Sequence, residues 1–176
     1  LTRMVPLLNQ LGVDARWTTI KGSEEFFGVT KKLHNALHGR KENISSEDFS
    51  LFLEVNKNNI EELKFQGDII FVHDPQPVAL IAEKKELGGK WIWRCHIDVS
   101  NPDKGAWEFV RNFVIEYDAA VFSSPNFTQQ LPIRQFLISP SIDPLSDKNK
   151  ELSSETIDSV LNKYGLDKDK PIIAQI

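Results

Sequence analysis

The chain has 176 residues, of which 40% are hydrophobic and 26% are charged. One domain of this length buries roughly 70% of its unfolded surface without needing disulfides or metals, and the composition excludes a disordered or collagen-like protein. The net charge of -4 argues against general nucleic-acid binding, which needs a basic surface. No apolar run reaches the ~20 residues of a membrane helix.

Helical and extended patterns alternate along the chain, and this alternation predicts an α/β fold with a parallel sheet. Helices are predicted where apolar residues recur at helical spacing, over residues 2–11, 24–37, 47–65, 78–85, 102–117 and 153–164. Strands are predicted where short apolar runs end in turn residues, over residues 13–20, 68–72, 91–95, 119–122, 136–138 and 171–176.

Both ends of the sequence are interpreted as internal to a longer protein. Residues 2–11 already show the spacing of a helix interior, and the apolar run 171–176 stops with neither a turn nor a polar tail. A strand ending there would leave a sheet edge unpaired. We therefore expect a lobe at 1–165 that lacks its first strand, a connector at 166–170, and at 171–176 the first strand of a second lobe. The alternative is a complete small protein with tight ends.

Polar or proline-containing segments follow four of the predicted strands, and ligands of open α/β sheets bind beyond the carboxyl ends of strands. These segments are 73–77, 96–98, 123–126 and 139–143. If their strands are neighbours, the pairs His73-Asp74 and His96-x-Asp98 converge at one edge. Three interpretations remain open: a metal site, a site that hydrogen-bonds sugar hydroxyls, and a structural role in which the aspartates cap helices.

Charged residues elsewhere add two observations. Arg94 interrupts a strand that otherwise reads as buried, so its charge is expected to pair with a carboxylate such as Asp74 or Asp98, or to point into a site. His34 and His38 lie four apart on a predicted helix and could face together. No glutamate completes a zinc-peptidase motif around them, which favours an ordinary helix surface. The sequence contains no nucleophile elbow and no phosphate-binding glycine loop.

Several segments carry a family resemblance: 25–31 with 34–37, 72–80, 91–98 and 140–146. Through them the chain resembles the trehalose-forming retaining glycosyltransferases, which are the trehalose glycosyltransferring synthases and trehalose phosphorylases of glycosyltransferase family four. The runs WRCHID (residues 93–98) and SPSIDPLS (residues 139–146) are the most specific. The resemblance extends over essentially the whole chain.

The resemblance implies a GT-B architecture, in which two Rossmann-like lobes enclose the active site. This chain would be the N-terminal, acceptor-side lobe, with helices on both faces of its sheet and incomplete at both ends. The implied reaction transfers glucose from a nucleoside diphosphate glucose to free glucose, giving trehalose with retention. The donor would bind mainly to the other lobe, whose cations neutralise the diphosphate. Neither a metal nor a cofactor is therefore expected.

The resemblance also implies roles for individual residues. His73 matches a family histidine near the transferred sugar and is the expected catalytic residue. Asp74 and Gln76 are expected to hold its loop or the acceptor hydroxyls. The remaining expected acceptor-site residues are Arg94, His96, Asp98, Lys31, His34 and Asn35.

Three other functions remain open: half of a trehalose phosphorylase, a non-catalytic sugar-binding or assembly domain, and a metal hydrolase. The isolated chain is expected to be inactive, because the groups that bind the sugar nucleotide would lie in the other lobe. Expected partners are glucose and the sugar nucleotide, with neither nucleic acid nor membrane. An open sheet edge predicts a homodimer or other self-association. The single cysteine, Cys95, suits a reducing compartment, and we expect a cytoplasmic protein.

Overall fold

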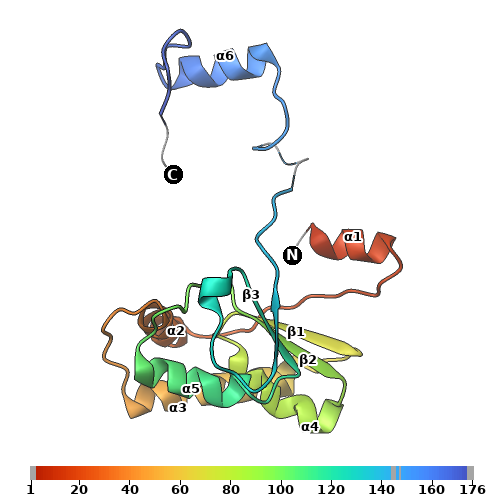
Figure 1. Ribbon diagram of the computed structural model, residues 1–176. Coiled ribbons are helices and arrows are strands. Elements are labelled where there is room, and N and C mark those ends of the chain that lie inside the picture. The colour runs from red at the N-terminus through yellow and green to blue at the C-terminus, as the bar shows by residue number, and fades with distance from the viewer. Residues whose placement is uncertain (1–2, 144–145, 147, 174–176) are drawn as a thin grey trace. The chain divides into compact units, whose positions relative to one another are not determined.

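The computed structural model describes residues 3–143, 146 and 148–173. By its internal contacts the chain divides into two units, Leu1–Ser139 and Pro140–Ile176. The first unit holds the sheet and most of the helices, and the second holds helix α6 (Ser154–Lys163) (Figure 1). The expected lobe boundary at residue 165 stays a prediction.

The first unit is built on a four-stranded sheet in the order β1-β2-β3-β4. Its strands are β1 (Ile69–His73), β2 (Lys90–Arg94), β3 (Ala119–Phe122) and β4 (Arg134–Leu137). Every neighbouring pair is parallel, so all four carboxyl ends meet at one edge. This arrangement confirms the predicted Rossmann-like α/β fold with a parallel sheet.

Helices connect the strands, and several of them begin directly after a residue whose side chain caps the helix. The helical elements of this unit are α1 (Met4–Gln10), α2 (Glu24–Leu37), α3 (Ser46–Leu63), α4 (Lys84–Leu87), α5 (Lys104–Val114) and the 3₁₀ helices η1 (Val78–Glu83) and η2 (Pro125–Phe127). Ser45 and Asp48 form a capping box at the start of α3, which satisfies backbone N–H groups that a helix leaves free. Residues 78–85, predicted as one helix, divide into η1 and the first residues of α4.

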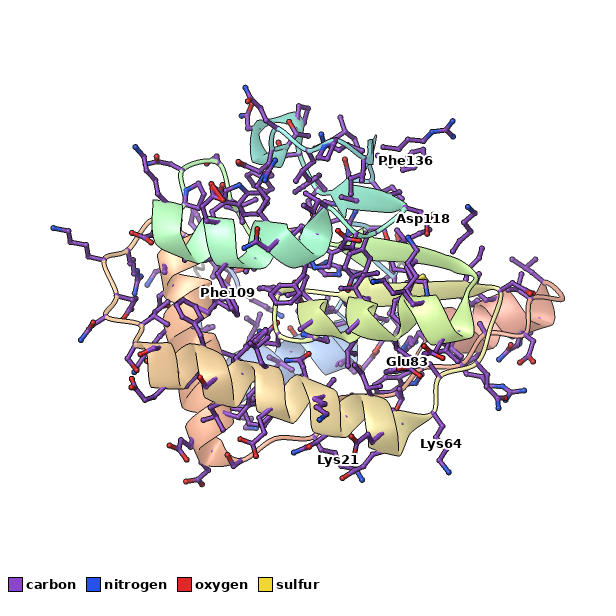
Figure 2. All side chains as sticks on the ribbon, turned by 90° about the horizontal axis from the view of Figure 1, so that it is seen from below. Lys21, Lys64, Glu83, Phe109, Asp118 and Phe136 are labelled. Atoms are coloured by element: carbon purple, nitrogen blue, oxygen red, sulfur yellow. The ribbon has the colours of Figure 1, made fainter. Side chains whose placement is uncertain are left out.

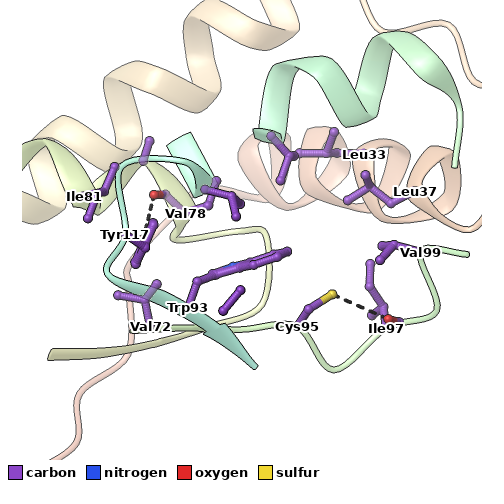
Figure 3. Packing of buried hydrophobic residues seen from close by; sticks show 14 of the residues in the cluster. Leu33, Leu37, Val72, Val78, Ile81, Trp93, Cys95, Ile97, Val99 and Tyr117 are labelled. Carbon is purple, nitrogen blue, oxygen red and sulfur yellow. Dashed lines mark hydrogen bonds between the residues drawn. The ribbon is translucent and has the colours of Figure 1, made fainter. Parts of the chain in front are cut away.

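The core lies between one face of the sheet and the layer formed by α2, α3, α5 and η1. Alternation along β2 points Trp91 and Trp93 to this face, and both are fully buried. The Tyr117 hydroxyl donates to the Val78 carbonyl at 2.8 Å and ties the start of β3 to η1 (Figure 3). The opposite face carries Phe71 and Phe136, which are 43% and 49% exposed.

Aromatic contacts join α5 to α3. The Phe109 ring of α5, which Figure 2 labels, lies 4.1 Å from the Phe49 ring and 5.4 Å from the Phe52 ring, measured between centroids. Phe109 also meets Phe113 edge to face at 5.4 Å. These contacts hold α3, whose buried side supports the loop after β1.

One predicted strand is wrong. Residues 13–20 form no strand, although their apolar and polar residues alternate. A strand needs a neighbour to pair with its backbone, and the Asn9 side chain instead holds both the Ala15 N–H and its carbonyl, at 2.8 and 3.2 Å. Of the strand predicted at 171–176, residues 171–173 form no strand and 174–176 lie outside the described residues. Residues 144–145 of the SPSIDPLS run also lie outside them.

Candidate functional site

Two histidines meet at the carboxyl edge of the sheet. His73 ends β1, and His96 follows β2 by two residues. His73 Nδ1 lies 2.8 Å from His96 Nε2, and the two rings are nearly parallel, with centroids 5.1 Å apart and an interplanar angle of 13°. At this distance one ring nitrogen carries a proton and donates a hydrogen bond, which the other ring nitrogen accepts. The sequence-based expectation that these two imidazoles converge is therefore confirmed.

Asp74 shapes the turn that brings these rings together. Its backbone is left-handed, with φ of 70°, a region that aspartate tolerates better than most residues. Its N–H donates to the Arg94 carbonyl at 2.8 Å, and its own carbonyl accepts from the Trp93 indole at 2.9 Å. Its Oδ1 accepts the backbone N–H of His96 at 3.2 Å. The Asp74 carboxylate therefore fixes the loop that carries His96.

Burial is the main cause that lowers the pKa of His73 from its ordinary value of 6.5. The neighbouring His96 and Arg94 lower this pKa further, and the Asp74 carboxylate raises it in part. The net direction is downward. His73 is therefore an uncharged imidazole at neutral pH.

Arg94 lies beside His73, because the register pairs the two residues across β1 and β2. Only 6% of it is exposed. Its guanidinium donates to the carbonyls of Phe122 and Ile138, at 3.4 and 2.7 Å, and to the Ser123 hydroxyl at 3.1 Å. Within the described part of the chain, these acceptors are all neutral, so the expected carboxylate partner is not found. The contacts fix the carboxyl end of β3 and the residue that follows β4.

The end of helix α2 forms a polar pocket. His34, Asn35, His38 and Arg40 line an open pocket of about 400 Å³. The His34 and His38 rings are 4.7 Å apart, which confirms that they face together. Burial and then His38 lower the pKa of His34, while the Asp74 carboxylate partly opposes them.

Three other expected site residues have separate surroundings. Asp98 accepts the Ser100 N–H at 2.8 Å, and hydrogen bonds from Ser100 lower the pKa of Asp98. The Asn35 amide donates to Glu42 at 2.8 Å. Lys31 is exposed on α2, and the structure does not bring it to the histidine pair through any contact found among the described residues. Its role stays a prediction.

Sequence reasoning missed Asn56, which holds the loop from behind. This residue lies on α3 with 1% exposure, and its Nδ2 donates to the Phe52 and Gln76 carbonyls at 2.9 and 3.1 Å. The bond to Gln76 anchors the loop that begins at Asp74. A detectable signal was present, because an asparagine interrupts the apolar stripe of this helix.

The histidines and aspartates of this edge do not assemble a metal site. Over residues 3–143, 146 and 148–173, no three histidine, cysteine, aspartate or glutamate side chains are grouped so that one ion could bind them all. The same residues contain no helix long and apolar enough to cross a membrane.

A parallel sheet flanked by helices, with an imidazole pair and a buried arginine at its carboxyl edge, defines a Rossmann-like lobe. Residues 1–129 match the family model described as the N-terminal domain of trehalose synthase. The chain belongs to this family, which confirms the resemblance found in the sequence.

Curated relatives are similar to the chain in sequence along its whole length. The trehalose synthases of Thermococcus litoralis and Pyrococcus furiosus are each 45% identical to it over 180 aligned residues, which include 100% of this chain and 43% of each relative. The trehalose synthase of Rubrobacter xylanophilus is 37% identical over 185 aligned residues, with 100% and 44% coverage. The chain thus spans less than half the length of these relatives.

Proposed function

We propose that the complete protein is a retaining glycosyltransferase that moves glucose from a nucleoside diphosphate glucose to glucose and so forms trehalose. This chain would contribute the lobe that faces the acceptor, and on its own it would be inactive. Relatives named trehalose synthase, 45% identical over the full chain, support this proposal. The sugar nucleotide is the donor, and the proposed scheme uses no metal or other cofactor.

The uncharged His73 imidazole carries the proposal. Glycosyl transfer passes through a transition state with oxocarbenium character, so positive charge develops on the transferred sugar. An imidazole kept neutral by burial can hydrogen-bond a hydroxyl of that sugar without repelling this charge. We assign His73 this contact and the orientation of the transferred glucose. Arg94 and Asp74 would shape the pocket around it.

The proposed transfer takes place on a single face of the sugar and uses no carboxylate nucleophile. Asp74, whose Oδ1 accepts the His96 N–H at 3.2 Å, is assigned to holding the loop. In the proposed scheme the bond from the anomeric carbon to the diphosphate oxygen breaks. The new bond forms to the acceptor hydroxyl, and the departing diphosphate takes the proton of that hydroxyl.

The test uses the complete protein with two sets of substrates. Trehalose formed from nucleoside diphosphate glucose and glucose supports the proposal. Glucose 1-phosphate formed only from trehalose and phosphate would identify a phosphorylase instead. Glucose-dependent amide NMR shifts without turnover in either assay would indicate a binding domain.

A pair of variants tests the site. His73→Ala should lower turnover at least ~100-fold, the lower range for loss of a positioned catalytic side chain. His38→Ala, at the other imidazole pair, is the matched control and should retain most activity. Equal losses in both variants would contradict the assignment of His73.

A further inference from the structure

The histidine pair at the edge of the sheet can exist in two neutral forms. In one form His96 Nε2–H donates to His73 Nδ1, so His73 keeps its own proton on Nε2. In the other form His73 Nδ1–H donates to His96 Nε2, and the one remaining proton lies on His96 Nδ1. The 2.8 Å distance fits either form. The two forms differ in what His73 offers to a ligand, which is a donor in the first and an acceptor in the second.

Intrinsic tautomer preference separates these forms. A neutral histidine side chain in water favours the proton on Nε2. The first form gives both imidazoles this favoured tautomer, and the second form gives both the disfavoured one. The contact between the rings therefore reinforces the intrinsic preference, because the hydrogen bond at one ring nitrogen sets the protonation of the other.

His96 is itself held in place for this contact. The Asp74 N–H donates to the Arg94 carbonyl at 2.8 Å, and the His96 backbone N–H donates to Asp74 Oδ1 at 3.2 Å. The contact between the imidazoles completes this closed set of hydrogen bonds. Asp74 also sits in a left-handed conformation that sets the direction of the loop. The backbone that carries His96 is thus fixed from the residue next to His73.

We propose that His96 is a positioning residue that locks His73 in the Nε2–H tautomer, so that His73 presents a hydrogen-bond donor to the transferred sugar. The consequence for catalysis rests on the proposed function, whereas the tautomer itself does not. In this role His96 acts on the reaction through His73.

The same arrangement opposes protonation of His73. A proton added at His73 Nδ1 would occupy the lone pair that accepts the hydrogen bond from His96 Nε2–H, and so break the contact. His96 and Arg94 oppose that charge, and Asp74 is the nearby group that favours it.

The test is long-range proton–nitrogen NMR of the imidazoles in the 176-residue chain, with no sugar present. The chain has four histidines, so single substitutions assign every signal. We expect His73 to carry its proton on Nε2 alone between about pH 6 and 8. In His96→Phe, which keeps a ring but removes the donor, we expect mixed tautomers at His73. His96→Gln, whose amide N–H can replace Nε2–H, should restore the single tautomer.

A matched control comes from the other imidazole pair. His38→Phe should leave the His73 signals unchanged, because His38 contacts His34 instead. A His73 proton on Nδ1 in the unaltered chain, or a His73 tautomer indifferent to His96→Phe, would overturn the proposal. In the complete protein, His96→Phe should lower kcat about tenfold and affect KM for glucose less, as for other residues that orient a catalytic group. Since the NMR result needs no turnover, it stands or fails separately from the proposed reaction.

Discussion

Replacing Asn56 with leucine is expected to lower the free energy of unfolding by about 1 kcal/mol. The Gln76 carbonyl would lose the donor that lies 3.1 Å away, and an unsatisfied carbonyl in a partly buried site costs about 1–3 kcal/mol. Part of this cost is offset, because the buried Asn56 Oδ1 has no hydrogen bond with the described residues and leucine removes it. Leucine keeps the branched outline of asparagine and is larger, so no cavity forms.

Asn56→Asp should be far more destabilising, by about 3 kcal/mol or more. It puts a carboxylate against the Phe52 and Gln76 carbonyls, so two acceptors face a third in a site that is 1% exposed. Burial alone makes a carboxylate costly at this site, and the two carbonyls that face it add to that cost. Leucine bears neither cost, so the two variants should differ clearly.

The assay is urea unfolding followed by tryptophan fluorescence. All four tryptophans lie in residues 1–139, so the signal reports on the unit that contains the site. With a urea slope of about 2 kcal/mol per molar, the leucine variant should shift the midpoint by about 0.5 M. Equal midpoints for Asn56→Leu and Asn56→Asp would refute the reasoning. Asn59→Leu is the control, because Asn59 bonds the backbone of Lys21 and not the loop after β1. This variant should leave the NMR signals of His73 and His96 unchanged.

Three further predictions concern ionisable groups. Burial raises the pKa of the Cys95 thiol to about 12, so we expect no alkylation in the folded chain at pH 8 and rapid alkylation in urea. The pKa of His73 is lowered, mainly by burial, so below about pH 6.5 the unfolded chain binds a proton at this residue and the folded chain does not. The urea midpoint should therefore fall as the pH drops below 6.5, and it should fall less in His73→Gln. For Asp118, burial acts to raise the pKa, but the Trp91 N–H and Lys84 outweigh it and the pKa is lowered. The stability that Asp118 contributes is therefore present above pH 4 and lost as pH falls through the lowered pKa; Asp118→Asn should cost about 1 kcal/mol at pH 7 and flatten this acid limb.

The sheet and its helices could be predicted because local signals agreed with the final packing. The apolar run at residues 119–122 became the fully buried strand β3. The serine before α3 is its cap, a position that serine favours. In these segments the local conformational preference of each residue agrees with its tertiary surroundings, and this agreement allows the structure to be predicted from the sequence.

The strand predicted at residues 13–20 failed for a non-local reason. Alternation describes what a strand would bury, but it does not supply the neighbour whose backbone must pair with it. Asn56 was missed for a related reason, because its partner Gln76 lies 20 residues away in the sequence. The convergence of His73 and His96 was predictable from strand order. The ring contact at 2.8 Å was not, because it depends on the left-handed turn at Asp74.

That turn limits which amino acids can occupy position 74. A side chain there must accept a φ of 70° and offer an oxygen to the His96 N–H. Asparagine meets both demands, glycine meets only the first, and alanine meets neither. Most residues lose about 1–2 kcal/mol in this region of the backbone. A library selected only for correct folding should therefore retain aspartate, asparagine and glycine at this position, so sequence variation there would record the geometry of the chain and not the identity of the sugar.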